Sequence, residues 1–449
     1  MSSLSRLSLS GAVLLLAAAP LRADTLKVPV QFDTIQAAVD AAVAGDVVQV
    51  SKGIYDENVV VSTAGITLKG KGATINGRIL GNCLAINAND VTVESLTLIN
   101  GAGEPLPDGG TTGGVHAVGT GITLSKLTVH DFGTFGILLE GTGTVTGCKV
   151  DTGHGDGIDV VTGDIVSDPV TVISKNKVSR CATGIFASGG VFLVEKNTID
   201  VCKEVGMEVQ VPAATRGPPA FTQTTISKNT IRLCLSVGLL VEQELQKSQG
   251  VLVEKNTLEL NATGCHLVGF AITFDSNALQ DNVLDGIDLE GSNCTLTKNK
   301  VKDSGLLGII VSSAGATDGG SAPTGANTLD QNAVQGNAGD GVAVISSGNT
   351  ITGSTIKDNG GDGIEVWLNA DDNQLTDNKV TGSGHEGIDN SGLNTTIADN
   401  TCKDSGGADL AGAGDGTGTV NLADSTGNTV SDDSDISTYT TTGLLDLTL

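Results

Sequence analysis

An asparagine that is followed about nine residues later by a glycine and an apolar residue recurs along most of this chain. The asparagines lie mostly 21 to 24 residues apart, with longer intervals where a loop is inserted, and a serine fills one position. The positions are Asn176, Asn197, Asn229, Asn256, Asn277, Asn299, Asn332, Ser354, Asn378 and Asn400. A fixed period in this range is typical of a solenoid, in which each repeat packs against its neighbours only.

The composition favours short strands joined by tight turns. Glycine accounts for 62 of the 449 residues, and aromatic residues for only 2%. Glycine and asparagine tolerate the positive φ angles that tight turns require. We therefore predict an all-β solenoid that grows by adding coils, rather than several globular domains.

Two columns of side chains are expected to face the interior. In earlier repeats Leu127 and Cys148 occupy the asparagine position, and a position that accepts Leu, Cys and Asn is best explained as buried. Buried asparagines need partners, so we expect hydrogen bonds along the column. Five residues further on, a second column changes from cysteine to asparagine: Cys181, Cys202, Cys234, Asn261, Asn282, Asn337 and Asn359. Adjacent strands lie about 4.8 Å apart, so these cysteines are expected either to form disulfides or to remain buried thiols.

The two ends of the chain differ from the repeats. Residues 1–23 combine basic Arg6 with a short apolar run, which is typical of a cleavable signal peptide and predicts a secreted or periplasmic protein. Residues 24–62 are expected to form an N-terminal cap, residues 63–403 the solenoid, and residues 404–449 a cap or tail rich in Gly, Asp and Thr. Within the N-terminal cap we expect a helix that begins at Asp33, buries Ile35, Val39 and Ala42, and covers the open end of the solenoid.

The formal net charge is −26, and it becomes −28 once Arg6 and Arg22 are removed with the leader. Such a chain repels phosphate backbones and anionic lipid, so we expect no nucleic-acid partner. It also repels polyuronates unless a cation lies between them. No later segment is long and apolar enough to predict a membrane span, and nothing in the sequence predicts an oligomeric state.

The N-terminal strings TIQAAVDAA, GDVVQV, KGIYDENVVV and GITLKGKG resemble the first segment of right-handed parallel β-helix proteins, such as pectin methylesterases and NosD-type periplasmic proteins. The Gly53-x-Tyr55-x-Glu57 signature belongs to this resemblance, which implies a single-stranded right-handed parallel β-helix of the pectin-lyase-like fold. The catalytic strings of pectin methylesterases, such as Gln-Asp-Thr, are absent. The resemblance therefore extends to the fold and not to that activity.

Strand side chains alternate, so the residue after each Gly-apolar pair is expected to point outward and form a polar stripe on one face. A first cluster on this stripe combines His154, Asp156 and Asp159 with His130 of the preceding coil. Carboxylates and imidazoles brought together can do acid–base work, so these four are candidate catalytic residues. The Asp-Gly-Ile-Asp string also resembles a motif of polygalacturonase-type hydrolases, in which Asp156 would be a catalytic carboxylate, although the partner strings of that family are missing.

A second cluster combines two consecutive coils. Its members are Asp362, Glu365, Trp367, His385, Glu386 and Asp389. Glu365 and Asp389 are expected to be neighbours, and two adjacent carboxylates need a shared proton or cation. Calcium suits such an oxygen-rich site. Trp367 is the only tryptophan, expected either to stack on a sugar ring or to pack under a loop.

Two functions remain open at this point. The first is an exported repeat protein that either binds polysaccharide or cell-envelope glycan or serves as a non-catalytic surface or periplasmic module, with no obligatory cofactor and calcium as an optional one. The alternative is a carbohydrate-active enzyme (a polysaccharide lyase, glycoside hydrolase or epimerase) that uses one of the two clusters. A fold alone does not decide between them.

Overall fold

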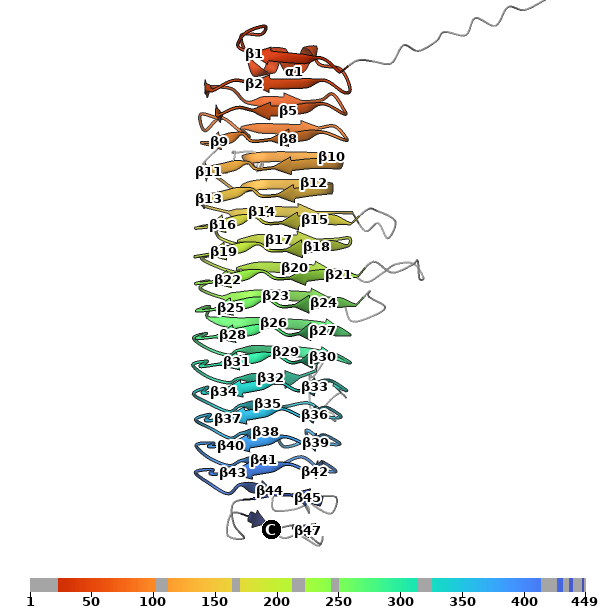
Figure 1. Cartoon of the computed structure of the whole chain (residues 1–449), viewed down its shortest axis with the longest axis vertical. Coiled ribbons are helices and arrows are strands. Elements are labelled where there is room, and N and C mark those ends of the chain that lie inside the picture. The colour runs from red at the N-terminus through yellow and green to blue at the C-terminus, as the bar shows by residue number, and fades with distance from the viewer. Residues whose placement is uncertain are drawn as a thin grey trace, which may run out of the picture.

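The computed structural model describes residues 23–101, 112–163, 170–211, 223–243, 250–313, 325–412, 426–430, 436–438 and 446–447. These residues wind into one long coil of short parallel strands, with a single helix at the N-terminal end (Figure 1). The predicted all-β solenoid with a short N-terminal helix is confirmed. The predicted signal peptide, apart from Ala23, lies outside the described residues.

Each turn of the coil contributes one strand to each of three stacks, here called faces 1, 2 and 3. Face 1 consists of β4 (Val59–Val61), β7 (Leu84–Asn87), β10 (Gly113–Ser125), β12 (Phe135–Thr146), β14 (Asp156–Val161), β17 (Ile185–Ser188), β20 (Met207–Val211), β23 (Val237–Gln243), β26 (Thr263–Phe270), β29 (Ile287–Ser292), β32 (Ile309–Ser312), β35 (Val342–Val344), β38 (Ile364–Val366), β41 (Ile388–Asn390), β44 (Leu410–Gly412) and β46 (Ile436–Thr438).

Face 2 consists of β1 (Thr25–Val28), β2 (Val47–Val50), β5 (Thr67–Gly70), β8 (Thr92–Glu94), β15 (Thr171–Ser174), β18 (Phe192–Glu195), β21 (Thr224–Ser227), β24 (Val251–Glu254), β27 (Ile272–Asp275), β30 (Thr295–Thr297), β33 (Thr328–Asp330), β36 (Thr350–Thr352), β39 (Gln374–Thr376), β42 (Thr396–Ala398), β45 (Thr426–Asn428) and β47 (Asp446–Leu447). The long strands β10 and β12 run through both faces and join them into one sheet.

Face 3 is a separate sheet. It consists of β3 (Gly53–Tyr55), β6 (Ala73–Asn76), β9 (Thr97–Ile99), β11 (Thr128–Phe132), β13 (Lys149–Gly153), β16 (Lys177–Ser179), β19 (Thr198–Asp200), β22 (Thr230–Arg232), β25 (Thr257–Glu259), β28 (Ala278–Gln280), β31 (Lys300–Lys302), β34 (Ala333–Gln335), β37 (Thr355–Lys357), β40 (Lys379–Thr381) and β43 (Thr401–Lys403).

The core is a set of aligned columns inside the coil. On face 1 the apolar residue of each Gly-apolar pair points inward and is buried, and Ile158 lies opposite Ile185, which lies opposite Met207. Every coil places an Ile, Leu, Val, Met or Cys at this position, so each new coil adds apolar surface to the same column. Burial of such side chains stabilises the fold by about 1.5–3 kcal/mol each.

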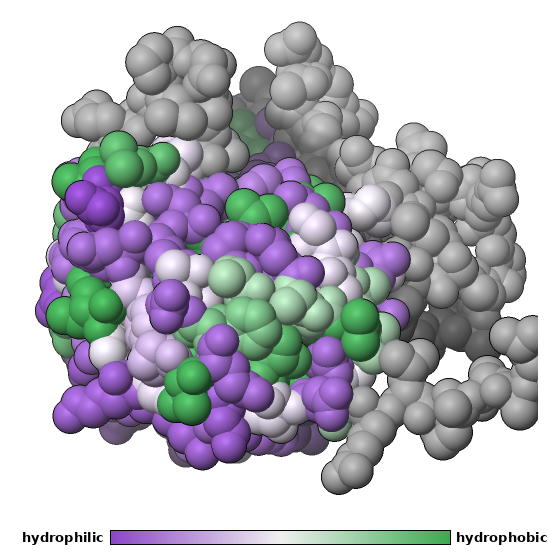
Figure 2. All heavy atoms as spheres, turned by 90° about the horizontal axis from the view of Figure 1, so that it is seen from above, coloured by the Kyte–Doolittle hydropathy of each residue, from purple (hydrophilic) through white to green (hydrophobic). Residues whose placement is uncertain are grey.

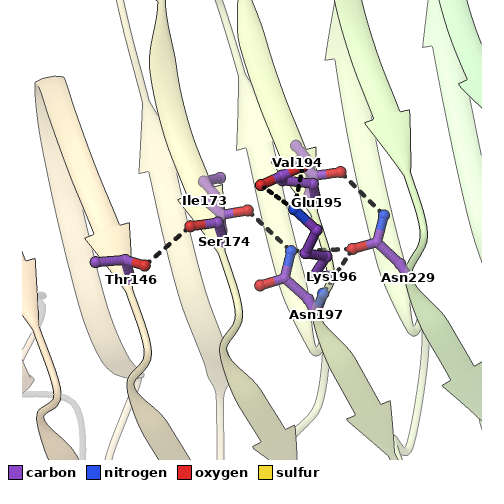
Figure 3. A network of polar contacts seen from close by, with 8 residues as sticks. All are labelled: Thr146, Ile173, Ser174, Val194, Glu195, Lys196, Asn197 and Asn229. Carbon is purple, nitrogen blue, oxygen red and sulfur yellow. Dashed lines mark hydrogen bonds and ion pairs between the residues drawn. The ribbon is translucent and has the colours of Figure 1, made fainter.

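The predicted asparagine column is confirmed. It lies inside the turn between faces 2 and 3, and its members are buried. Asn197 Oδ1 accepts hydrogen bonds from the backbone N–H and the side-chain amide of Asn176, at 3.0 and 3.1 Å. The amide of Asn197 in turn donates to the carbonyl of Ile173 and to Asn229 Oδ1 (Figure 3). Asn197 therefore satisfies two backbone groups of the preceding coil and is linked by its side chain to the asparagine of the next coil.

Positive φ angles fall on the residue before these asparagines, not on the asparagines themselves. Lys175, Lys196, Lys228 and Lys255 have φ between 55° and 58°. The left-handed residue bends the chain, and the asparagine that follows closes the bend from inside. The exposed lysines show that the bend does not need glycine, although the left-handed conformation is uncommon for other residues.

The second inward column is also buried, and all eight cysteines are free thiols. Of the two alternatives for Cys181, Cys202 and Cys234, the structure has the buried thiols. Burial raises the pKa of Cys181 to about 12, so its thiol stays protonated.

A third column of buried, hydrogen-bonded asparagines lies in the turn between faces 1 and 2. There Asn327 Nδ2 donates to Asn349 Oδ1 at 3.0 Å.

The helix α1 (Ile35–Ala41) packs beside β1, β2 and β4 at the N-terminal end and buries Ile35 and Val39, as predicted. Its cap differs from the prediction, because Thr34 rather than Asp33 accepts the hydrogen bond from Ala37 N, at 3.1 Å. Glu57 accepts from Ile35 N and Gln36 N, both at 3.0 Å, which explains the acid of the Gly-x-Tyr-x-Glu signature. Seen along the axis, the described surface of this end is mainly hydrophilic around a band of hydrophobic residues (Figure 2).

No helix in the described part of the chain has the length and apolar character of a membrane span. Strand pairing continues past Asp404, where β41 pairs with β44, and β44 with β46. The described part of the 404–449 segment therefore continues faces 1 and 2.

Candidate functional site

The outward stripe of face 1 is in register along the coil, as the alternation predicts. His116 lies opposite Leu138, which lies opposite Asp159, and the same column continues through Phe186, Glu208, Leu240, His266, Asp288, Ile310, Ala343, Glu365 and Asp389. Its polar members are half-buried. Side chains at paired positions of adjacent strands lie within contact distance. Each carboxylate of the stripe therefore interacts with the side chains at the same position one coil before and one coil after it.

Several acidic residues lie together near the C-terminal end of face 1. Here β35, β38 and β41 are consecutive, and Glu365 lies opposite Asp389 in adjacent strands. The residues that precede Gly341, Gly363 and Gly387 add further carboxylates to the same region. We call this set the carboxylate cluster: Asp340, Asp362, Glu365, Glu386 and Asp389.

Part of this cluster serves the coil itself. Asp340 Oδ1 accepts from the backbone N–H of Asp362, and Asp362 Oδ1 from that of Glu386, each at 2.7 Å. The same contact occurs outside the cluster, where Asp156 accepts from Thr183 N and Asp285 from Leu307 N at 3.0 Å. An Asp before the Gly-apolar pair therefore ties one coil to the next with one oxygen, and its second oxygen remains for other contacts.

Two groups of potential ligand atoms converge within the cluster. One oxygen each of Asp340, Asp362 and Glu365 lie within 4.8 Å of one another, and so do donor atoms of Asp362, His385 and Glu386. These are the only groups of three or more such residues found in the described part of the chain. The expected partner of Glu365, Asp389, belongs to neither group. Asp340, which the sequence analysis did not predict as a site residue, lies near Glu365 in the first group instead.

The cluster holds its carboxylates in an environment that disfavours their charge. Burial raises the pKa of Asp362 to about 7, although the N–H of Glu386 opposes the rise. Burial likewise raises the pKa of Glu365 to about 7, and the nearby Asp340 side chain adds to it. The pKa of Asp389 is raised by burial and by the charge of Glu386, and its Oδ1 is buried without a hydrogen-bond partner. Crowded carboxylates of this kind share protons or take up a cation.

Trp367 lies at the edge of this cluster. Its side chain is 46% exposed, so the alternative in which it packs under a loop is wrong. The indole N–H donates to Glu365 Oε2 at 2.7 Å, which fixes the ring beside the carboxylates. Tryptophan rarely stays exposed without a reason, because its apolar area is large. An exposed aromatic ring with one edge tied to an acid is a platform on which a ligand can stack.

The first predicted cluster is not assembled as one site. His130 lies on face 3 opposite Asp151, and its Nδ1 contacts Asp131 Oδ2 at 2.6 Å. His154 is exposed in the turn between β13 and β14 and lines a cleft on that edge of the coil. Asp156 and Asp159 are together on β14 of face 1. The turn after face 3 separates the two histidines from the two carboxylates, so a joint acid–base role for all four has no geometric support.

Asp159 nevertheless has an unusual environment. It lies between Leu138 and Phe186 in the outward column, and its Oδ1 is buried without a hydrogen-bond partner. Burial raises the pKa of Asp159 to about 8, and the charges of Asp156 and Glu208 add to the rise. The carboxyl is therefore protonated at neutral pH.

The variant Asp159→Asn is expected to change how stability depends on pH. A raised carboxyl pKa gives the folded state more bound protons than the unfolded state, so wild-type stability falls as pH rises from about 4 to about 8. The variant lacks this loss and is expected to be at least about 1 kcal/mol more stable than wild type at pH 8. Chemical denaturation at pH 5 to 9 measures this, with exposed Asp399→Asn as the control. Parallel pH profiles of wild type and Asp159→Asn would contradict the assignment.

Comparison with known proteins gives the following matches. The family model described as a right-handed beta helix region matches residues 113–279 and 285–443. A similar solved structure is the A-module of the Azotobacter vinelandii mannuronan C-5 epimerase AlgE4, with 16% identity over 92% of this chain and 94% of that chain and a TM-score of 0.41.

Two further structures are similar at the same level. A mutant of the periplasmic alginate epimerase AlgG has 12% identity over 90% of this chain and 82% of that chain, with a TM-score of 0.39. The Dettilon tailspike protein has 15% identity over 80% of this chain and 66% of that chain, with a TM-score of 0.40. No curated protein sequence matches the chain. These likenesses are too distant to bear on the activity.

Proposed function

The chain belongs to the family of proteins with a right-handed β-helix region, and we propose that it is a polysaccharide-binding module whose site is the carboxylate cluster together with Trp367. The exposed indole, fixed 2.7 Å from Glu365, is the observation that carries this proposal. A pyranose ring has an apolar C–H face that stacks on an aromatic ring and hydroxyl groups that donate to carboxylates. Both kinds of partner are adjacent in this site. The signal-like leader supports a location outside the cytoplasm.

A divalent cation fits this site. Asp340, Asp362 and Glu365 offer only oxygen ligands, which calcium prefers. No lysine or arginine in the described part of the chain forms an ion pair with any member of the cluster. The unpartnered Oδ1 of Asp389 indicates that the hydrogen bonds of the coil do not satisfy the cluster fully. A bound cation would neutralise the crowded carboxylates and would let this acidic protein accept an acidic glycan.

The variant Trp367→Ala tests the proposal. Loss of the stacking platform is expected to weaken retention by a bound polysaccharide between about fivefold and about thirtyfold, because one such contact contributes about 1–2 kcal/mol. Affinity electrophoresis through gels with acidic and neutral polysaccharides, with calcium or with a chelator, measures the retention. The control is Leu235→Ala, which removes an exposed apolar side chain before the start of β23, at the opposite edge of face 1. Equal retention of Trp367→Ala and wild type, or no retention on any polysaccharide, would overturn the proposal.

A hydrolytic activity is the second candidate. It is favoured by Glu365, whose pKa of about 7 suits a general acid and which lies beside two other carboxylates. Glycosidases use such a pair of carboxyl groups, one of them with a raised pKa. A screen for reducing ends and unsaturated products on the same polysaccharides separates the two functions. Products formed by wild type and lost in Glu365→Gln would favour the enzyme, whereas binding without products would favour the module.

A further inference from the structure

The cleft that His154 lines is far from the carboxylate cluster, on the edge of the coil that follows face 3. It has a volume of about 380 Å³, which is within the range of small-molecule sites. Its described lining comes from strand ends and turns of consecutive coils: Ile79, Asn100, Gly101, Asp131, Phe132, Thr152, Gly153, His154, Arg180 and Lys203. None of these residues belongs to the site proposed above, although His154 was a sequence-based candidate.

At Gly153 the ring of Phe132 takes the place of a side chain in the inward column. Gly153 lies opposite Phe132 in adjacent strands, and a Cβ at Gly153 would be 1.9 Å from the Phe132 ring. A Cβ at Gly101 would be 2.3 Å from the carbonyl oxygen of Gly113. One coil beyond Gly153, the column resumes with buried Cys181. The Phe132 ring fills the space beside Gly153 and is itself buried, so the exposed apolar surface of the described lining comes from Ile79 at the rim.

Three of the ten described lining residues have basic side chains. His154, Arg180 and Lys203 line it, in a chain that has 25 basic residues (Lys and Arg) against 51 acidic ones. Arg180 is held in place, because its Nη2 contacts the carboxylate of Asp151 and its Nε donates to Thr152 Oγ1 at 3.2 Å.

The ammonium group of Lys203, by contrast, has no hydrogen bond or ion pair with any described residue. Asp131 is the one acid among the described residues of the lining, and its Oδ2 contacts Nδ1 of His130 at 2.6 Å. The ammonium group of Lys203 is therefore available to a ligand, whereas the carboxylate of Asp131 already contacts His130.

We propose that this cleft binds a small amphipathic carboxylate, that is, an apolar ring that carries one carboxylate group. The ring would lie in the cleft of about 380 Å³ against exposed Ile79, and the carboxylate would pair with Lys203 beside the fixed guanidinium of Arg180. An apolar pocket with a few placed polar groups is the usual form of a small-molecule site. This site is independent of glycan binding at the carboxylate cluster.

Benzoate, benzamide and acetate separate the two parts of this recognition. Benzoate has both the ring and the charge, benzamide lacks the charge, and acetate lacks the ring. The affinities are measured by ligand-detected NMR with the full chain and each probe at up to about 10 mM. Benzoate is expected to bind at least about tenfold more tightly than benzamide or acetate. Equal binding of benzoate and benzamide, or no binding of benzoate, would overturn the proposal.

The variant Lys203→Gln is expected to weaken benzoate binding about fivefold, in keeping with the loss of one partly exposed ion pair. Lys203 is on the surface, so the variant is expected to fold. The matched control is Lys228→Gln, which removes an exposed lysine from a turn outside the cleft. Unchanged benzoate affinity in Lys203→Gln would contradict the assignment. Retention of this variant on polysaccharide is expected to equal that of wild type, so the two proposals can fail separately.

Discussion

Replacement of Asn256 by alanine is expected to lower the free energy of unfolding by about 4 kcal/mol. Asn256 Oδ1 accepts from the backbone and side-chain amides of Asn229, at 2.9 and 3.0 Å. Its own amide donates to the carbonyl of Ile226 and to Asn277 Oδ1, both at 3.0 Å. All these groups are buried, so alanine leaves several of them without a partner and opens a small cavity.

Urea denaturation measures the global effect of this variant. Native-state hydrogen exchange measures the local one, which is needed because long repeat arrays do not always unfold in two states. The backbone amide of Asn229 is expected to lose protection, since its acceptor is gone. The control is Gln280→Ala, which removes an exposed amide and is expected to change stability by less than about 0.5 kcal/mol. If Asn256→Ala lowers the free energy of unfolding by less than about 1 kcal/mol and the backbone amide of Asn229 stays protected from exchange, the asparagine column does not hold the coil together.

Calcium is expected to stabilise the wild-type protein at pH 8 and to have little effect at pH 5. Because the pKa values of Asp362 and Glu365 are raised to about 7, the cluster is protonated at low pH and loses stability as pH rises through 7. A cation that needs the ionised carboxylates restores this loss. At a calcium concentration one hundred times the dissociation constant, the gain is about 2.7 kcal/mol.

The double variant Asp362→Asn with Glu365→Gln is expected to be more stable than wild type at pH 8 without calcium and to gain nothing from it. Thermal unfolding with calcium and with a chelator measures both effects. The control is Asp285→Asn, whose residue has the same backbone contact as Asp362 but lies outside the cluster. Equal calcium responses of wild type and the double variant would place the cation elsewhere.

The repeat was sufficient to predict the coil, because the pattern that builds the coil is local and periodic. The spacing of residues such as Asn197 and Asn229 identified the inward column, and alternation after each Gly-apolar pair gave the outward column in the correct register. The third column, with Asn327 and Asn349, escaped notice because it lies in another turn and next to an inserted loop. It was thus predictable that asparagines are buried in hydrogen-bonded columns, but the number of such columns was not.

The candidate sites were predicted less completely, because they depend on turns rather than on strands. Asp340 was missed since only the residue after each Gly-apolar pair was followed, whereas the residue before the glycine points into the same cluster. His130 and Asp159 were grouped from their proximity in sequence, yet the turn after face 3 sends them to different faces. The exposure of Trp367 is a property of the bend after β38, which no periodic pattern describes.

The central claim is a cation-dependent glycan site at the carboxylate cluster. It is tested most directly by comparing how polysaccharide retains wild type and the double variant Asp362→Asn with Glu365→Gln, first with calcium and then with a chelator. We expect wild type to be retained in calcium and released by the chelator, and the double variant to migrate freely in both conditions. Retention of the double variant equal to that of wild type, or retention of wild type that the chelator leaves unchanged, would contradict a cation-dependent glycan site at the carboxylate cluster.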